Sequence, residues 1–418
     1  MLSHALEGLT VIDFTQIAAG PISTMLMADM GARVIKVEPP AGELGRGLGP
    51  GWIGNEVGNE ADKESALFHA FNRNKHGIAL DLKSPDGLAV ARRLIASADI
   101  VVESMRPGVM ERLGLGYQQL AAEHPALIYC SISAYGQSGP YADRAGVDGI
   151  LQADAGLMSL IGMADSEPCK VQAPVVDVMT GYVAVVGVLA KLAQRQRDGN
   201  GGHLDVNLLN AALALQQSSL TSYLADRELP ARTGSAAPYS APNQAFRTAD
   251  GWIMVAAYMP DRWRRLCETL GLGELIDDPR FATSPMRVAN RAAMVEALTQ
   301  RFVTRTTAAW LDVLQAVDIL CAPVATYADV VDHPQVAANR MITEVAHPTL
   351  GSIRMPAFPI CSAGANAQPA RPAPACGQDT ATVLRMFGFD AEQIATLATR
   401  GAIVCNAHIR ADTPAMTS

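Results

Sequence analysis

The feature that most constrains the fold of this chain is a strand–helix–strand pattern in its first forty residues. Thr10 to Phe14 reads TVIDF, an apolar and β-branched run that predicts a strand. Pro21 to Gly31 begins with proline and ends with glycine, as helices often do, and Ala32 to Glu38 predicts a second strand. The connecting loop TQIAAG lacks the G-x-G-x-x-G spacing of a dinucleotide site. The pattern therefore predicts a Rossmann-like unit and disfavours a dehydrogenase.

The same alternation continues to about residue 136. Three further apolar runs predict strands: Gly77 to Lys83, Asp99 to Ser104, and Ala126 to Gly136. Near-continuous apolar strands are typical of parallel sheets covered on both faces, and such sheets bind ligands beyond the carboxyl ends of their strands. We therefore expect TQIAAG, the residues after LDLK, ESMRPG and SAYGQSG to form one rim.

A single acid, Asp177, interrupts the apolar stretch VQAPVVDVMTGYVAVVGVLAKLAQ. We expect a long helix from Asp177 to about Arg197. An Asp at a helix start is typically an N-cap that accepts backbone N–H bonds, worth about 1 kcal/mol. The same position could hold a reactive carboxylate, kept ionised by the positive end of the helix dipole. The residues alone leave both roles open.

Composition excludes several classes of protein. The chain has 418 residues, of which 49% are hydrophobic, so it can bury a large core over two or three structural units. A formal net charge of −8 argues against a nucleic-acid partner, which requires a cationic surface. We recognise no signal peptide, and glycines and polar residues break the apolar runs, so we expect a cytoplasmic protein with no membrane partner.

The cysteines and histidines show no metal-binding spacing. The seven cysteines are scattered without a C-x-x-C pair, and the eight histidines form no H-x-x-x-H pattern. We therefore predict reduced thiols, no metal site and no permanently bound cofactor.

The second half of the chain changes composition. Glu228 to Gln244 is rich in Pro, Ser, Ala and Gly and predicts a linker, whereas Asp250-Gly251 between apolar runs predicts a hairpin in a smaller α+β unit. The predicted domains are a large Rossmann-like domain over 1–225, a linker over 226–244, a small α+β domain over 245–330, and a return segment over 331–418 that completes the large domain.

Seven segments, in order, resemble the family III coenzyme A transferases of the CaiB/BaiF type, a superfamily that also contains formyl-CoA transferases and α-methylacyl-CoA racemase-like proteins. These segments are LEGLTVIDFTQIAAGP, GARVIKVEPPAGE, NRNKHGIALDLKSPDG, ESMRPGVMERLGLGY, SISAYGQSGPYADRAGVDGILQADAGLM, VVDVMTG, and CAPVATYADVVDHPQV with MITEVAHP. The resemblance implies an α/β fold: a Rossmann-like parallel-sheet domain made from both chain ends, a smaller α+β domain, and an interlocked homodimer.

The resemblance also implies a reaction and a site. Asp177 matches the nucleophile, which would transfer coenzyme A from an acyl-CoA to a carboxylic acid through a mixed anhydride and an aspartyl-CoA thioester. Coenzyme A or acyl-CoA would be a substrate rather than a resident cofactor. The implied coenzyme contacts are Ala18, Ala19, Leu80, Lys83, Ser104, Met105, Arg106, Arg112, Ala134 and Tyr135.

Two alternatives stay open. Racemases of this superfamily need two proton carriers, but Val147 stands where they have histidine and carries no proton, although Asp148 adjoins it. A non-catalytic acyl-CoA-binding protein would not need Asp177. No motif names the acids; small dicarboxylates such as succinate, itaconate, mesaconate or malate are plausible acceptors, and Arg232 is a candidate for binding a distal carboxylate.

Overall fold

The computed structural model describes residues 2–54, 63–362, 365–366 and 368–406, so the terminal stretch ADTPAMTS lies outside the described residues. The chain divides into two compact units by its internal contacts. The large unit comprises Met1–Ala155, Gln172–Gln217 and Pro334–Ser418, and the small unit comprises Gly156–Val171 and Ser218–His333. The domain boundaries expected from the sequence stay a prediction.

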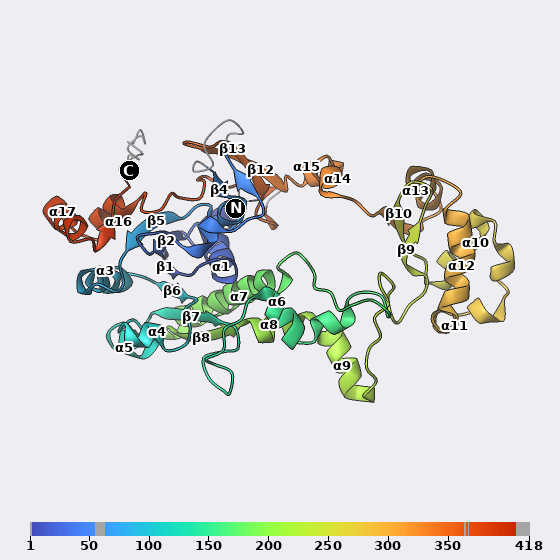
Figure 1. Ribbon diagram of the computed structural model, residues 1–418, viewed down its shortest axis with the longest axis horizontal. Helices are drawn as coiled ribbons and strands as arrows, with labels where there is room; N and C mark the ends of the chain where they lie inside the picture. Colours follow the sequence, from blue (N-terminus) through green and yellow to red (C-terminus); the bar gives the residue numbers. More distant parts are fainter. Residues whose placement is uncertain (1, 55–62, 363–364, 367, 407–418) are drawn as a thin grey trace. The chain divides into compact units, whose positions relative to one another are not determined.

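A seven-stranded sheet organises the large unit, in the order β16-β5-β2-β1-β6-β7-β8 (Figure 1). Its strands are β1 (Thr10–Phe14), β2 (Arg33–Glu38), β5 (His76–Leu80), β6 (Ile100–Glu103), β7 (Ile128–Ser133), β8 (Gly202–Asn207) and β16 (Ile403–Val404). All neighbouring strands pair in parallel except β16, which runs antiparallel to β5. The predicted α/β class with a parallel-dominated sheet is therefore confirmed. The chain passes from β1 to β2 and β5 on one side and to β6, β7 and β8 on the other, which places a topological switch point between β1 and β6.

Alternate residues of β1 face different helices. Ile12 and Phe14 belong to a core cluster with side chains of α3 (Pro85–Ile95), α16 (Thr380–Met386) and α17 (Ala391–Thr399). Asp13 instead accepts a hydrogen bond from Thr24 of α1 (Ala19–Asp29), and α1 packs against α7 (Val175–Asp198). All five residues of β1 are buried, as expected for the central strand of a covered sheet.

Shorter elements complete the large unit. They are η1 (Leu2–His4), η2 (Leu44–Gly47), β3 (Trp52–Ile53), β4 (Glu64–Ser65), α2 (Ala66–Asn72), α4 (Val109–Arg112), α5 (Tyr117–Glu123), α6 (Asp148–Asp154), α8 (Leu208–Leu215), α15 (Pro334–Ala338), β12 (Ile342–His347), β13 (Gly351–Pro356), β14 (Cys361–Ser362) and β15 (Ala365–Asn366).

Helix α7 corrects one expectation. Its 24 residues are long and apolar enough to cross a membrane by length and composition, with a mean hydropathy of 1.8 in its most apolar 18-residue window. The glycines and polar residues therefore do not break this run as expected, because one glycine lowers the mean of a long apolar window only slightly. A core helix meets the same criterion, and α7 packs against α1, α8, β7 and β8.

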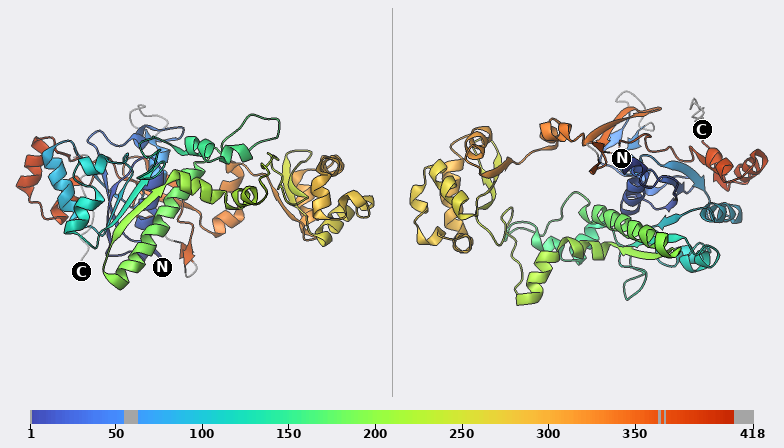
Figure 2. Two further views of the ribbon diagram at one scale, coloured as in Figure 1. Left: turned by 90° about the horizontal axis from the view of Figure 1, so that it is seen from below. Right: turned by 180° about the vertical axis from the view of Figure 1, so that it is seen from behind.

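The small unit contains a three-stranded antiparallel sheet and a group of helices, coloured from yellow to orange in Figure 2. Its main elements are η4 (Leu157–Leu160), α9 (Gln217–Asp226), β9 (Asn243–Arg247), β10 (Trp252–Ala256), α10 (Pro260–Leu270), η5 (Gly273–Leu275), η6 (Pro279–Phe281), α11 (Ser284–Ala289), α12 (Arg291–Phe302), α13 (Thr307–Gln315), β11 (Leu320–Pro323) and α14 (Tyr327–Val331). The predicted hairpin is confirmed, since β9 and β10 pair around Asp250-Gly251. Its core includes Phe246 stacked on Phe302 at 5.0 Å.

Candidate active site

Loops at the carboxyl ends of β1, β6 and β7 meet around Asp177. They enclose, with the first turns of α1 and α7, a cavity of about 200 Å³ that we call the nucleophile cavity. Its lining residues are Gln16, Ile17, Ala18, Ala19, Gly20, Ser104, Ile132, Ser133, Ala134, Gly146, Val147, Asp177 and Leu208. The cavity lies where parallel α/β sheets bind ligands, beside the switch point between β1 and β6.

Asp177 is not the N-cap of its helix. Helix α7 begins at Val175, two residues earlier than predicted, and its N-cap position, Pro174, has no side chain that can accept a bond. Asp148 takes the capping role: its Oδ2 accepts bonds from the N–H groups of Val176 at 2.9 Å and Asp177 at 3.3 Å. The Asp177 carboxylate is therefore not needed as an acceptor for the N–H groups at the start of α7.

Burial, and then the charge of nearby Asp148, raise the pKa of Asp177 to about 7. The expectation that the helix dipole keeps this carboxylate ionised is met only in part, because a group with a pKa of about 7 is partly protonated at neutral pH. Removal from water and repulsion between two acids outweigh the attraction of one helix end. Among the described residues, no cation forms an ion pair with Asp177, so its anionic form is poorly stabilised.

Close helix packing holds Asp177 beside the start of α1. Gly181 lies one turn after Asp177, and a Cβ atom at Gly181 would lie 2.9 Å from the carbonyl oxygen of Ala19 and 2.7 Å from Cγ2 of Ile22. Glycine thus permits a contact between α7 and α1 that any side chain would disturb.

A second cavity, of about 300 Å³, lies at the same edge of the sheet, and we call it the coenzyme cavity. Its lining residues are Phe14, Thr15, Gln16, Val37, Glu38, Pro39, Glu43, Leu80, Asp81, Leu82, Lys83, Met105, Val109 and Leu113. Gln16 lines both cavities, so a ligand that filled one could continue into the other.

The implied coenzyme contacts fall into three groups. Ala18, Ala19, Ser104 and Ala134 line the nucleophile cavity, and Leu80, Lys83 and Met105 line the coenzyme cavity. Arg106, Arg112 and Tyr135 line neither. The two arginines are exposed, and the hydroxyl of Tyr135 donates to Asp154 at 2.9 Å.

The implied contacts do not include Gln16 and Ile17, although the predicted rim loop TQIAAG contains both. Their place in TQIAAG, directly after a central parallel strand, was the available signal, because such loops form the ligand-binding rim.

Three side chains outside the cavities could offer metal ligands. Atoms of Glu64, His69 and His347 lie within 4.8 Å of one another. However, Nε2 of His69 is 3.0 Å from Glu64, and Nδ1 of His347 accepts the N–H groups of Thr349 and Leu350. His347 then carries its proton on Nε2, the atom that would have to face a metal. This arrangement favours a hydrogen-bonded cluster, and the absence of a metal stays a prediction.

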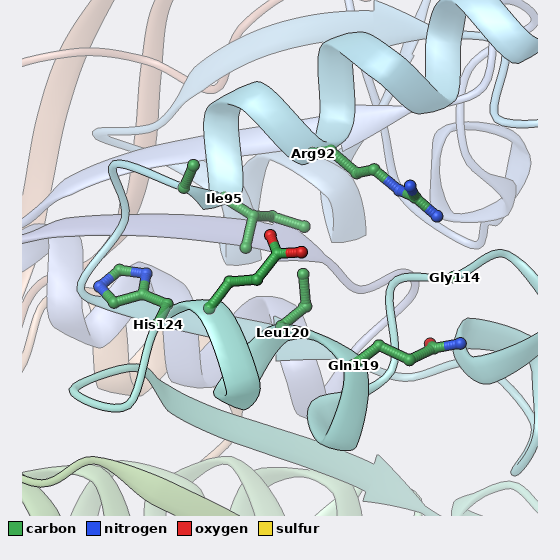
Figure 3. Close-up of a pocket in the computed structure, with 8 residues that line it drawn as sticks. Arg92, Ile95, Gly114, Gln119, Leu120 and His124 are labelled. Atoms are coloured by element: carbon green, nitrogen blue, oxygen red, sulfur yellow. The ribbon is translucent and has the colours of Figure 1, made fainter.

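Another cavity, of about 350 Å³, lies between α3 and α5 (Figure 3). Ile95 and His124, which line it, precede β6 and β7, so this cavity lies at the amino ends of the strands, opposite the candidate site. Arg92, Gln119 and Glu123 give it an exposed, mixed-charge lining.

A parallel sheet whose rim places a half-buried carboxylate beside two adjoining cavities is typical of α/β enzymes that bind ligands at this edge. Residues 6–380 match the model of CoA-transferase family III, and the chain belongs to this family as a CoA-transferase.

Known relatives cover almost the whole chain. The chain is 36% identical over 400 residues to the succinyl-CoA:glutarate CoA-transferase of Mus musculus, covering 95% of this chain and 90% of that protein. It is 35% identical over 385 residues to the succinate–glutarate CoA-transferase of Agrobacterium fabrum, covering 91% and 94%. A CAIB/BAIF family protein from Brucella suis has a crystal structure that superposes with a TM-score of 0.82 at 35% identity, covering 91% of this chain and 99% of that one.

Proposed function

We propose that this CoA-transferase moves coenzyme A from an acyl-CoA such as succinyl-CoA to a small dicarboxylate, with Asp177 as the covalent nucleophile. The observation that carries the proposal is the half-buried Asp177, which has no ion-pair partner among the described residues and lies in a cavity that shares Gln16 with the coenzyme cavity. The glutarate named for two relatives supports a five-carbon dicarboxylate as acceptor, alongside the succinate, itaconate, mesaconate and malate expected from the sequence.

Covalent exchange at Asp177 accounts for the transfer. A carboxylate oxygen attacks the thioester carbonyl, the C–S bond breaks, and CoA thiolate leaves a mixed anhydride. The thiolate then attacks the Asp177 carbonyl carbon, which expels the donor carboxylate and forms an aspartyl-CoA thioester. The acceptor carboxylate attacks this thioester, and the released thiolate attacks the acceptor carbonyl, which regenerates Asp177.

The surroundings of Asp177 suit this chemistry. A pKa of about 7 leaves much of the carboxylate ionised at neutral pH, in a form less stabilised by water than an exposed acid. Ala19 and Gly20 open α1 and line the same cavity. The first N–H groups of a helix have no partner within it, so they can donate to the oxyanion of the attacked carbonyl.

The residues around the nucleophile cavity support racemase activity less well than CoA transfer. Val147 lines the nucleophile cavity but cannot carry a proton. Asp148 is buried, and its carboxylate already accepts bonds from Gln152, Val176 and Asp177. A second proton carrier opposite Asp177 would have to come from another residue.

Arg232, the candidate from the sequence for binding the distal carboxylate of the acceptor, belongs to the small unit, and its role stays a prediction. Its Nη2 donates to the carbonyl of Ala164 at 3.2 Å, whereas its Nη1 is buried with no hydrogen-bond partner among the described residues. Arg232→Met should raise KM for glutarate more than for acetate, and equal changes for both acids would count against this role.

We also propose a homodimer in the cytoplasm. Tyr182, Val186 and Leu189 expose apolar side chains on α7, and Val186 is 66% exposed. A second copy of the chain would cover this face, as apolar helix faces favour burial. Sedimentation analysis should show a dimer that Val186→Glu weakens; a monomeric wild-type chain would contradict the proposal.

The reaction itself is tested by trapping. Incubation with succinyl-CoA and hydroxylamine should convert Asp177 to a hydroxamate that mass spectrometry places on its peptide, and Asp177→Ala should lower kcat at least about 1000-fold. CoA binding by calorimetry should persist in the variant. Labelling of another residue, or near-normal turnover in Asp177→Ala, would place the nucleophile elsewhere.

A further inference from the structure

The loop beside Asp177 contains a residue in an unfavourable backbone conformation. Ile17 has φ of 71°, in the left-handed region that β-branched residues rarely enter. It stands between Gln16 and Ala18, and all three line the nucleophile cavity. Such a conformation persists only where the surroundings impose it, and it occurs preferentially at functional sites.

A buried carboxylate imposes it. Oε2 of Glu43, in the segment after β2, accepts the N–H of Ile17 at 2.9 Å and the N–H of Gly45 at 2.8 Å. The Glu43 side chain is only 2% exposed. Because Gly45 belongs to η2, these bonds tie the loop after β1 to a separate segment of the large unit.

A buried lysine supports the same loop from the other side. Nζ of Lys36 donates to the carbonyl of Thr15 at 3.0 Å and lies 3.4 Å from Oε1 of Glu43. Lys36 and Glu43 thus fix the backbone on both sides of Gln16, whose own N–H donates to Ser104 at 3.2 Å. These bonds restrain the loop that leads from β1 into α1, beside Asp177.

We propose that Glu43 is a positioning residue for the transfer reaction: it holds Ile17 left-handed, so that Gln16, Ala18 and the first turn of α1 lie correctly around Asp177. This inference rests on the proposed function, because it assigns the loop a role in the reaction at Asp177. Misplacement of reacting groups by about 1 Å can cost roughly 100-fold in rate, which is the size of effect at issue.

Glu43 also lines the coenzyme cavity, so a direct contact with coenzyme is the competing explanation. A double-mutant cycle with Ile17→Gly separates the two. Glycine adopts positive φ without steric cost, so the Ile17→Gly chain needs no carboxylate to hold the loop. Direct contact with coenzyme, in contrast, would be lost equally whichever residue stands at position 17.

We expect Glu43→Ala to lower kcat about 100-fold in the wild-type background and less than about 10-fold in the Ile17→Gly background, with little change in the Kd for CoA. Asp29→Ala is the matched control, because it also removes a buried carboxylate, the partner of Arg73, but one without a bond to the loop. Its cost should be the same in both backgrounds. Hydrogen–deuterium exchange of the Ile17 amide should be slow in the wild-type chain and fast in Glu43→Ala.

Equal rate losses in the two backgrounds, or unchanged exchange at Ile17 in Glu43→Ala, would overturn the inference. The exchange measurement needs no turnover, so it decides the matter even if the proposed chemistry is wrong. Conversely, labelling of Asp177 by hydroxylamine would stand even if Glu43 proved unimportant.

Discussion

Two acids in the large unit, the buried Asp13 and the half-buried Asp177, have pKa values shifted in opposite directions. Asp13, at 0% exposure, would have a raised pKa from burial alone, but Lys75, Lys36 and the hydroxyls of Thr15 and Thr24 lower the pKa to about 2. Among the described residues Asp177 has no such partners, and partial burial together with the charge of Asp148 raises its pKa to about 7. The difference shows that nearby cations and hydroxyls can outweigh the effect of burial on the pKa of a carboxylate.

Replacement of Lys75 tests whether its ion pair with Asp13 stabilises the fold. Nζ of Lys75 lies 3.0 Å from Oδ2 of Asp13, and both side chains are fully buried. Lys75→Met leaves the buried Asp13 carboxylate without this ion-pair partner, so the free energy of unfolding should fall by about 3–5 kcal/mol. Urea denaturation measures this loss. Exposed Lys63→Met is the control and should change stability little; equal effects of the two would show that the Asp13 pair does not stabilise the fold.

Replacement of Asp177, in contrast, should raise the free energy of unfolding at neutral and alkaline pH. Since its pKa is raised, the folded chain holds a proton that the unfolded chain has released between about pH 4 and pH 7, and the free energy of unfolding falls as pH rises through this window. Asp177→Asn removes that penalty, so it should stabilise the protein by up to about 4 kcal/mol at pH 8.5 and hardly at pH 4.

The control for that measurement is Asp165→Asn at an exposed position. A gain in stability that is the same at both pH values would mean that the charge of Asp177 is not the cause. For Asp13 the dependence runs the other way: its contribution is present above about pH 4 and is lost as pH falls toward 2.

Substitution of Gly181 tests whether close packing of α7 against α1 fixes the position of Asp177. Gly181→Ala would bring Cβ against the Ala19 carbonyl, so unfolding should require about 1–3 kcal/mol less, and turnover should fall because the start of α1 must shift. Gly187→Ala on the same helix is the matched control, since its Cβ would meet only the Leu204 side chain, at 3.5 Å. If both variants behaved alike, the close contact at Gly181 would have no special role.

The smallest expected effect concerns Asp148. Asp148→Asn removes a negative charge near Asp177 but keeps an oxygen that can accept the bond from Val176. The pKa of Asp177 should fall, so the acid limb of kcat/KM should move to lower pH by roughly one unit. A pH–rate profile measures this shift, and a limb that stays in place would indicate that another group controls it.

The sequence predicts much of the large unit because its signals are local. β1 was expected over Thr10 to Phe14, as the structure has it, and the Asp250-Gly251 turn and the parallel sheet are also as predicted. Helix α7 begins two residues earlier than Asp177 suggested, because its cap is supplied by Asp148, 28 residues away in the sequence. A cap that comes from a distant segment leaves no local signal.

The candidate site likewise has features that local sequence patterns predict and features that depend on contacts between distant residues. Asp177 and the rim loops could be found from the sequence, because a lone acid in an apolar run and loops after parallel strands are local patterns. The sequence by itself thus determined the fold class, the rim and the family. Only the tertiary structure decided that Asp13 meets Lys75 from 62 residues away, that Glu43 holds Ile17, and that no cation pairs with Asp177 among the described residues. The charge state of a buried acid depends on which distant side chains folding brings to it, and no local pattern encodes that.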